Sequence, residues 1–436
     1  MKTLAALVKL PAAQRTVPRF RHWLAVVLLF AFVAGDGVAS AIQANRQLDS
    51  PYVFLVPLLF LAILLMVRDA GRISVRLALW LEGLLVFAVL LLLVQINVFR
   101  TMNLLGYAQL WVIFVALFAV QDLVAHASDA LIEAFGRGIR ILHYGVAAYL
   151  VVTAVVWYTA GIDLSVVALI VDAPSSVSEY YGFRPAGLNR EPAWAGFLLA
   201  ATFIAVYFSS PHDRLQALLA MVVGVAALRS GTAFAFTGIA VVAIVVQRRR
   251  DQSLGRSLLV GVVAASVLIG FAGERAGTVL EGADPSGLMR LRSASVAMDI
   301  ARDTFPMGIG YGNFRNVALY GQEFTSYIDL LADSEYKSDI AILNLVAEFG
   351  VGGLVMVGSL VALYGRGHHP LFWAHLGAVL FLAGGLLLPS NILVAVALGI
   401  HERERRRAPV SEVVVHRLPP PASRATAASP RPHVTA

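Results

Sequence analysis

The chain of 436 residues contains no cysteine, and only 14% of its residues are charged. Without cysteine it can form neither a disulfide nor a thiolate metal site. An ordinary soluble domain has about a quarter charged residues, so the shortage of charge argues against that class. The charge present is also unevenly spread, because residues 273–340 hold ten of the 27 Asp and Glu residues.

Long uncharged apolar runs fill much of the remaining sequence. Residues 51–67, 101–121 and 144–162 contain no Asp, Glu, Lys or Arg. Each run is near the ~20 residues that a helix needs to cross ~30 Å of hydrocarbon. We therefore predict an all-α, polytopic transmembrane bundle of about 12 spans. The net charge of +7 comes largely from short basic tracts beside apolar runs, so a lipid bilayer explains it better than a nucleic-acid partner.

Hydropathy gives approximate positions for these spans. Asp36 lies late in the first span, and apolar runs follow it, so we expect this span to remain uncleaved although Val38-Ala39-Ser40 resembles a signal-peptide cleavage site. The basic tail after His401 is expected in the cytoplasm, like the N-terminus, so the number of crossings must be even. The region 371–400 must therefore cross twice, as two short helices or a re-entrant pair around Pro389-Ser390-Asn391. The other expected spans are 22–42, 51–67, 79–98, 104–124, 143–161, 191–209, 214–229, 231–247, 257–273 and 341–364.

The distribution of basic residues predicts the orientation of the bundle. If the N-terminus is cytoplasmic, the cytoplasmic segments hold 23 of the 34 Lys and Arg residues. Short loops rich in Lys and Arg stay inside. The chain is therefore expected to be a multi-pass protein of the inner (plasma) membrane with both termini in the cytoplasm and residues 273–340 outside.

These expectations divide the chain into five parts. Within the long loop, the apolar residues of 287–302 recur at helical spacing, which predicts an amphipathic helix on the membrane surface or over the bundle. The parts are a cytoplasmic arm (1–21), a bundle of about nine spans (22–272), a large external loop (273–340), C-terminal spans (341–401) and a disordered basic cytoplasmic tail (402–436).

Several arginines on the expected outer side are candidate substrate-binding residues. A lone arginine at a helix end is often an anchor that reaches the membrane interface. Several on one leaflet face can instead bind diphosphate oxygens bidentately, because guanidinium groups stay charged when partly desolvated. The candidates are Arg184, Arg190, Arg229, Arg290 and Arg315.

Two carboxylates are candidates for a catalytic role. Glu191 precedes Pro192 at an expected helix start, so it has a structural interpretation as well as a functional one. Asp339 precedes the span that begins near 341 and allows the same two interpretations. Either carboxylate can take a proton from an attacking hydroxyl.

Two further patterns have better structural than functional interpretations. Gly308, Gly310 and Gly312 superficially resemble a nucleotide-binding loop, but no buried strand precedes them. They are better explained as a loop that turns closely against the bundle. His368-His369 is expected to lie in a solvated basic loop, not at a metal site, and no cofactor is expected.

The motifs between 180 and 355 together resemble those of the bacterial O-antigen ligase and polysaccharide polymerase superfamily of integral membrane enzymes. They occur in the family's order, beside ten or more expected spans and one large late loop. The matching segments are Arg184-Pro-Ala-Gly187-Leu, Glu191-Pro192, Arg229-Ser-Gly-Thr, the run Arg290 to Ala301, Pro306-Met-Gly308-Ile-Gly310-Tyr-Gly312-Asn313-Phe314 and Glu348-Phe-Gly350-Val-Gly352.

The resemblance implies a metal-independent glycosyltransferase on the outer face of the inner membrane. Its substrate would be an oligosaccharide linked to polyprenyl (undecaprenyl) diphosphate, and its further partners a chain-length regulator and export proteins. One departure favours an O-antigen or exopolysaccharide polymerase over a ligase. Ligases carry a histidine shortly before the Glu-x-Gly-x-x-Gly span, whereas this chain has no histidine between 213 and 367. A ligase, and a flippase or transporter for lipid-linked oligosaccharides, remain the alternatives.

Overall fold

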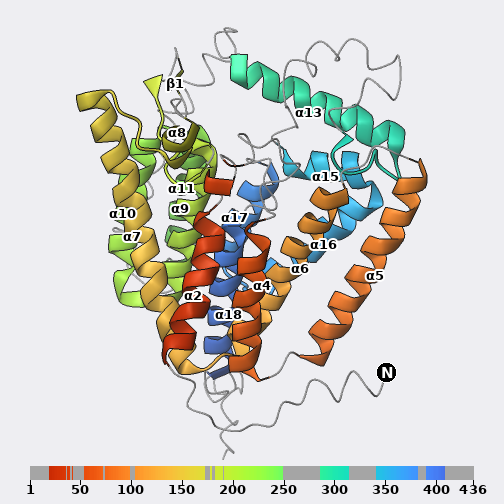
Figure 1. Cartoon of the computed structure of the whole chain (residues 1–436), viewed down its shortest axis with the longest axis horizontal. Helices are drawn as coiled ribbons and strands as arrows, with labels where there is room; N and C mark the ends of the chain where they lie inside the picture. Colours follow the sequence, from red (N-terminus) through yellow and green to blue (C-terminus); the bar gives the residue numbers. More distant parts are fainter. Residues whose placement is uncertain are drawn as a thin grey trace, which may run out of the picture.

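The fold is a bundle of α-helices (Figure 1). The computed structural model describes residues 19–35, 37–39, 42, 54–71, 74–98, 104–171, 177–178, 182–189, 191–248, 285–313, 340–381 and 389–407. Its main elements are α2 (Arg19–Ala34), α4 (Val56–Ala70), α5 (Val75–Val98), α6 (Leu104–His126), α7 (Asp129–Ala160), α8 (Val166–Val171), β1 (Val177–Ser178), β2 (Gly182–Phe183), α9 (Pro192–Ser209), η2 (Pro211–Asp213), α10 (Arg214–Leu228), α11 (Gly231–Arg248), α13 (Pro285–Thr304), α15 (Ala341–Phe349), α16 (Val351–Gly365), α17 (Pro370–Phe381) and α18 (Asn391–Arg407).

Within these ranges, four helices are long and apolar enough to cross a membrane, namely α5, α6, α7 and α9. They differ in how far the rest of the protein covers them. The apolar window of α9 is 83% buried and that of α5 only 22%. An apolar helix with most of its surface uncovered is stable only against lipid. Accordingly, α9 packs between α18, α7 and α10, whereas α5 stands at the edge of the bundle (Figure 1).

Helix ends that are far apart in the sequence meet at one end of the bundle, here called the charged end. His22 on α2 lies 2.9 Å from Asp69 on α4. Asp69 also accepts hydrogen bonds from the backbone N–H and hydroxyl of Ser128, just before α7. Arg403 on α18 pairs with Asp129 at 2.8 Å. The beginnings of α2 and α7 therefore lie beside the ends of α4 and α18.

The opposite end of the bundle, here called the loop end, carries α8, the β1–β2 ladder and α13 (Figure 1). The ladder is antiparallel and two residues long, and it is an exception to the all-α prediction. The amphipathic helix expected over 287–302 is confirmed as α13. Its Val296, Ala297 and Ile300 are buried against Ala347 of α15, so α13 packs over the bundle.

One predicted helix start is wrong by about four turns. The expected span 143–161 begins at Asp129 as α7, a helix of 32 residues. The Ser128 hydroxyl accepts a hydrogen bond from the Leu131 N–H at 3.2 Å and caps this helix. Hydropathy missed these turns because they carry Glu133, Arg137 and Arg140. At 1.5 Å per residue, α7 is about 48 Å long and extends beyond the hydrocarbon.

Two other boundaries also differ from the prediction. The expected span 341–364 is broken into α15 and α16 at Gly350, which has φ 55° and ψ −124°. Residues 402–407, assigned to the tail, continue α18 as a helix. The region 371–400 was expected to form either two short helices or a re-entrant pair. Two helices, α17 and α18, are observed there. The expected span 257–273 and the tail from 408 onward lie outside the described residues.

Candidate functional site

The candidate site lies at the loop end. Among the predicted site residues, Arg184, Glu191 and Arg229 have described side chains, and only the helical backbone of Arg290 is described, within α13. Arg190, Arg315 and Asp339 lie outside the described residues.

Arg184 follows β2 in a segment that is held against α7. The ring of Phe183 is buried and stacks on Trp157 of α7, with ring centroids 4.3 Å apart. Two residues beyond Arg184, the Ser165 hydroxyl accepts hydrogen bonds from the Ala186 and Gly187 N–H groups, at 3.1 and 3.2 Å. Arg184 itself is half-buried. The segment therefore presents a partly desolvated guanidinium beside the C-terminal end of α7.

Arg229 also lies beside the C-terminal end of α7. It ends α10 in the left-handed conformation, with φ 49° and ψ 32°, and its N–H donates to the Val225 carbonyl at 3.2 Å. Its guanidinium carbon lies 5.6 Å from the centroid of the Tyr158 ring. Because Trp157 and Tyr158 are consecutive, the structure brings both predicted arginines to the last turn of α7.

Glu191 lies at the helix start that its position predicts. Its backbone is extended, with φ −135° and ψ 150°, and Pro192 is the first residue of α9. The carboxylate is exposed and forms no cap to the helix N–H groups. It lies at the same end of the bundle as Arg184.

The glycine loop, residues 306–313, docks on the break between α15 and α16. The Ile309 and Gly310 N–H groups donate to the carbonyls of Ala347 and Glu348, at 2.8 and 2.9 Å. The Val351 N–H donates in return to the Pro306 carbonyl at 2.8 Å. The structural interpretation of Gly308, Gly310 and Gly312 is confirmed, since all three have positive φ in a loop that contacts the bundle.

Two buried polar side chains complete this joint. The Glu348 carboxylate accepts a hydrogen bond from the Gly312 N–H at 3.2 Å. Gln95 of α5 donates from its amide to the Met307 carbonyl at 2.9 Å and to the Glu348 carbonyl at 3.0 Å. Gln95 is not among the site residues predicted from the sequence, and Glu348 appears there only as part of a motif. An amide at the end of the long apolar run of α5 is the signal that could have identified Gln95.

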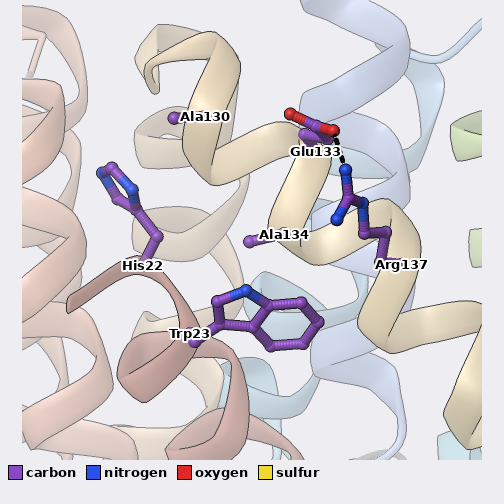
Figure 2. Close-up of a pocket in the computed structure, with 6 residues that line it drawn as sticks. All are labelled: His22, Trp23, Ala130, Glu133, Ala134 and Arg137. Carbon is purple, nitrogen blue, oxygen red and sulfur yellow. Dashed lines mark hydrogen bonds and ion pairs between the residues drawn. The ribbon is translucent and has the colours of Figure 1, made fainter. Parts of the chain in front are cut away.

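A small cavity lies at the charged end instead, between α2 and α7 (Figure 2). Its volume is about 110 Å³, below the ~300 Å³ at which ligand pockets begin. Arg137 and Glu133 form an ion pair on its α7 side. None of the predicted site residues lines it, so this cavity is not the candidate site. It is lined by His22, Trp23, Ala130, Glu133, Ala134 and Arg137.

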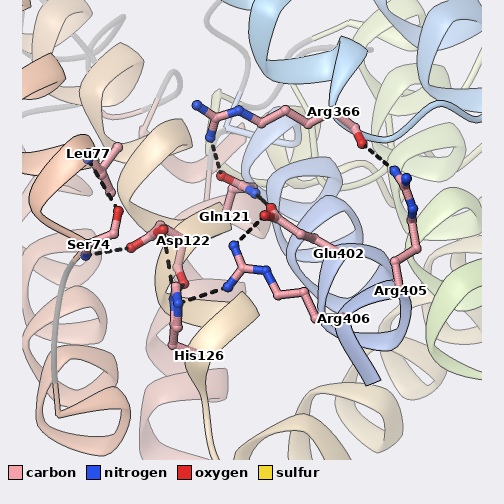
Figure 3. Close-up of polar contacts among 9 residues, drawn as sticks. All are labelled: Ser74, Leu77, Gln121, Asp122, His126, Arg366, Glu402, Arg405 and Arg406. Atoms are coloured by element: carbon pink, nitrogen blue, oxygen red, sulfur yellow. Dashed lines mark hydrogen bonds and ion pairs between the residues drawn. The ribbon is translucent and has the colours of Figure 1, made fainter. Parts of the chain in front are cut away.

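The polar contacts in Figure 3 also belong to the charged end. Gln121 of α6 donates to Glu402 of α18, and Arg406 of α18 contacts both Glu402 and His126. Asp122 accepts a hydrogen bond from the Ser74 N–H at 3.1 Å, just before α5. These contacts join the ends of α6 and α18 to the beginning of α5, which is a structural role.

The solvated loop expected at His368-His369 is wrong for one of the two residues. His368 is exposed, but His369 is buried against the rings of Phe208 and Phe372. Its Nδ1 accepts a hydrogen bond from the Leu371 N–H at 3.1 Å. Burial and the nearby positive charge of Arg214 lower the pKa of His369 to about 4, so the ring is neutral near pH 7.

The structure thus defines a helical membrane protein with two arginines and a docked glycine loop at one end. No family model, curated protein or solved structure matches the chain. Among the described residues, no three His, Cys, Asp or Glu side chains gather as metal ligands do.

Proposed function

We propose that this protein is a polysaccharide polymerase of the inner membrane, acting on its outer face. It would transfer a growing glycan from one polyprenyl diphosphate to a second lipid-linked repeat unit. The sequence motifs support this proposal, as do the positions of Phe183-Arg184 beside Trp157 and of Arg229 beside Tyr158 at the end of α7. Guanidinium groups suit a diphosphate because they bind its oxygens in a planar, bidentate manner.

The reaction forms one bond and breaks one. An acceptor hydroxyl oxygen attacks the anomeric carbon of the donor glycan, and the bond from that carbon to the diphosphate oxygen breaks. The electron pair leaves with polyprenyl diphosphate. Negative charge grows on the departing diphosphate, so preorganised arginines stabilise the transition state more than the ground state. The hydroxyl proton passes to a carboxylate, for which Asp339 and Glu191 are the candidates.

The backbone of Arg229 is the observation that carries most weight. A residue other than glycine in the left-handed region costs about 1–2 kcal/mol, and a helix commonly ends there with glycine. An arginine at φ 49° therefore lowers the free energy of unfolding relative to glycine, while it places a guanidinium at the loop end. Strained residues of this kind cluster at functional sites.

Deleting the gene tests the proposed function directly. If the protein is a polymerase, cells without it accumulate single repeat units on the lipid carrier. Accumulation of long lipid-linked polymer would instead identify a ligase. An unchanged profile of lipid-linked sugars would contradict any role in glycan transfer. Re-expression of Arg184→Lys should leave the single units in place, whereas Arg137→Lys, an exposed arginine of the charged end, should restore the polymer.

A further inference from the structure

The corner where α13 ends above α5 exposes three large apolar side chains. Met298, Phe305 and Met307 have 58%, 53% and 42% of their surfaces exposed. The opposite side of the same helix is packed on α15 through Val296 and Ile300. Together, Met298, Phe305 and Met307 are called the apolar corner. Exposed apolar side chains grouped at a helix end mark an interaction surface.

The apolar corner continues the lipid-facing surface of α5. The Met307 carbonyl accepts a hydrogen bond from Gln95, near the outer end of α5. On the side of this helix that faces away from the buried Gln95, Leu93, Leu90 and Val89 are 54%, 57% and 54% exposed. Figure 1 shows α13 sloping toward the outer end of α5 at the edge of the bundle. The exposed apolar side of α5 and the apolar corner therefore lie at the same edge of the bundle.

The charge beside the corner fits the surface of a membrane. Met298 and Arg302 are spaced as i and i+4, so they share one face of α13, and Phe305 directly follows the helix. Arg302 is exposed between the two apolar residues, and the neighbouring Asp303 is exposed as well, so the local charge is mixed. A basic residue among apolar ones is the pattern of helices that lie at the level of phospholipid headgroups.

We propose that the apolar corner is inserted among the phospholipids of the outer leaflet and anchors α13 there. Its apolar side chains enter the upper acyl region, and Arg302 faces the headgroup phosphates. The anchor fixes the depth of the glycine loop, because that loop begins at Pro306 and is bonded to Val351. This inference holds whether or not the protein transfers glycans.

The absence of cysteine makes a direct test possible, because single cysteines can be spin-labelled in the otherwise native chain. The full-length protein is reconstituted in phospholipid vesicles with a label at Met298→Cys, Phe305→Cys or Met307→Cys. Collision rates are then measured with oxygen, which concentrates in lipid, and with a water-soluble nickel chelate. Val89→Cys serves as the lipid reference and Arg137→Cys as the water reference.

The expected result is that oxygen collisions exceed nickel collisions at all three corner positions, as at Val89→Cys, and that the order is reversed at Arg137→Cys. Higher nickel than oxygen collision rates at the corner would overturn the proposal, because the corner would then face water. Low rates with both reagents would overturn it as well, since the corner would be covered by protein, such as a second copy of the chain.

Discussion

Arg229 has a backbone conformation that is unusual for a residue other than glycine. Glycine at this position would adopt φ 49° without strain, because it has no Cβ. Tyr158 supplies a ring 5.6 Å from the guanidinium, and a cation–π contact at an exposed site contributes only about 0.5–1 kcal/mol. This contact does not offset the strain of about 1–2 kcal/mol. A ligand for the guanidinium is therefore the better explanation of the arginine.

Replacing Arg229 by glycine should separate stability from activity. We expect Arg229→Gly to raise the free energy of unfolding by about 1 kcal/mol through relief of the strained backbone, and to abolish chain extension. Thermal unfolding in detergent and the length of the glycan product measure the two effects.

The charged end offers a matched control for this variant. His368 is the other residue besides glycine with positive φ among the described residues, at 48°. His368→Gly should stabilise by a similar amount and extend chains normally. If Arg229→Gly also retains full activity, Arg229 is only an anchor.

At the scale of elements, the joint between the glycine loop and the broken helix is the most constrained part of the loop end. A Cβ on Gly350 would lie 2.0 Å from the Pro306 carbonyl oxygen, and one on Gly308 would lie 2.5 Å from the Gly350 nitrogen. Real Cβ atoms do not approach backbone atoms so closely. The two segments thus fit only because both contact positions are glycine.

A single methyl group should therefore detach the loop. We expect Gly350→Ala to expose the glycine loop to proteases and to reduce chain extension by at least tenfold, while the protein still reaches the membrane. Gly358→Ala in α16 is the control, since a Cβ there meets no atom within 4 Å. Limited proteolysis of both variants checks the result. Equal protection of Gly350→Ala and the unchanged protein would show that the loop is not held by this joint.

The connection between α16 and α17 should make stability depend on pH. Burial and nearby positive charges lower the pKa of His369 to about 4, below the ~6.5 of an unfolded histidine. The unfolded chain therefore binds the proton more readily, and the stability contributed by the neutral ring is lost as the pH falls from about 6.5 toward 4.

Melting temperatures in detergent at pH 7 and pH 5 measure this effect. The unchanged protein should melt at a lower temperature at pH 5, and His369→Asn, which keeps an acceptor for the Leu371 N–H, should lose part of this difference. His212→Asn alters an exposed histidine and should keep all of it. The same pH difference in all three proteins would show that His369 does not contribute.

At the scale of the whole molecule, helix boundaries could be predicted where a long apolar run ends abruptly at polar or charged residues. Spans expected at 191–209 and 231–247 are observed as α9 and α11, with ends shifted by no more than one residue. The early turns of α7 were missed because hydropathy detects burial in lipid, and Arg137 and Arg140 lie beyond it. The break at Gly350 was missed because it depends on a contact with Pro306, more than forty residues away in sequence.

The candidate site was predictable in its residue types but not in its contacts. Arg184 and Arg229 were predicted as site residues because they carry charge at expected span ends. Both lie beside the C-terminal end of α7. The partners of the glycine loop could not be predicted, because Gln95 reaches it from 212 residues away along the chain. Such long-range contacts leave no periodic pattern in the sequence.

The orientation of the whole bundle is a prediction that reporter fusions can check. The charged end gathers Arg366, Arg403, Arg405, Arg406 and Arg407. By the positive-inside rule this end faces the cytoplasm. A fusion at about residue 325 should therefore report the periplasm or cell exterior, and one after residue 408 the cytoplasm. A cytoplasmic signal at 325 would place the loop end on the wrong side for an extracellular polymerase.

Glycan transfer by the purified protein tests the central claim most directly. The protein, in phospholipid vesicles, is given a polyprenyl-diphosphate-linked repeat unit without nucleotide sugar, and product lengths are resolved by gel electrophoresis. We predict a ladder of lipid-linked polymers with the unchanged protein and with Arg137→Lys. Arg184→Lys and Arg229→Lys should leave only the single unit, because lysine lacks the planar fork for the diphosphate. Polymers of normal length from both of these variants would contradict the account.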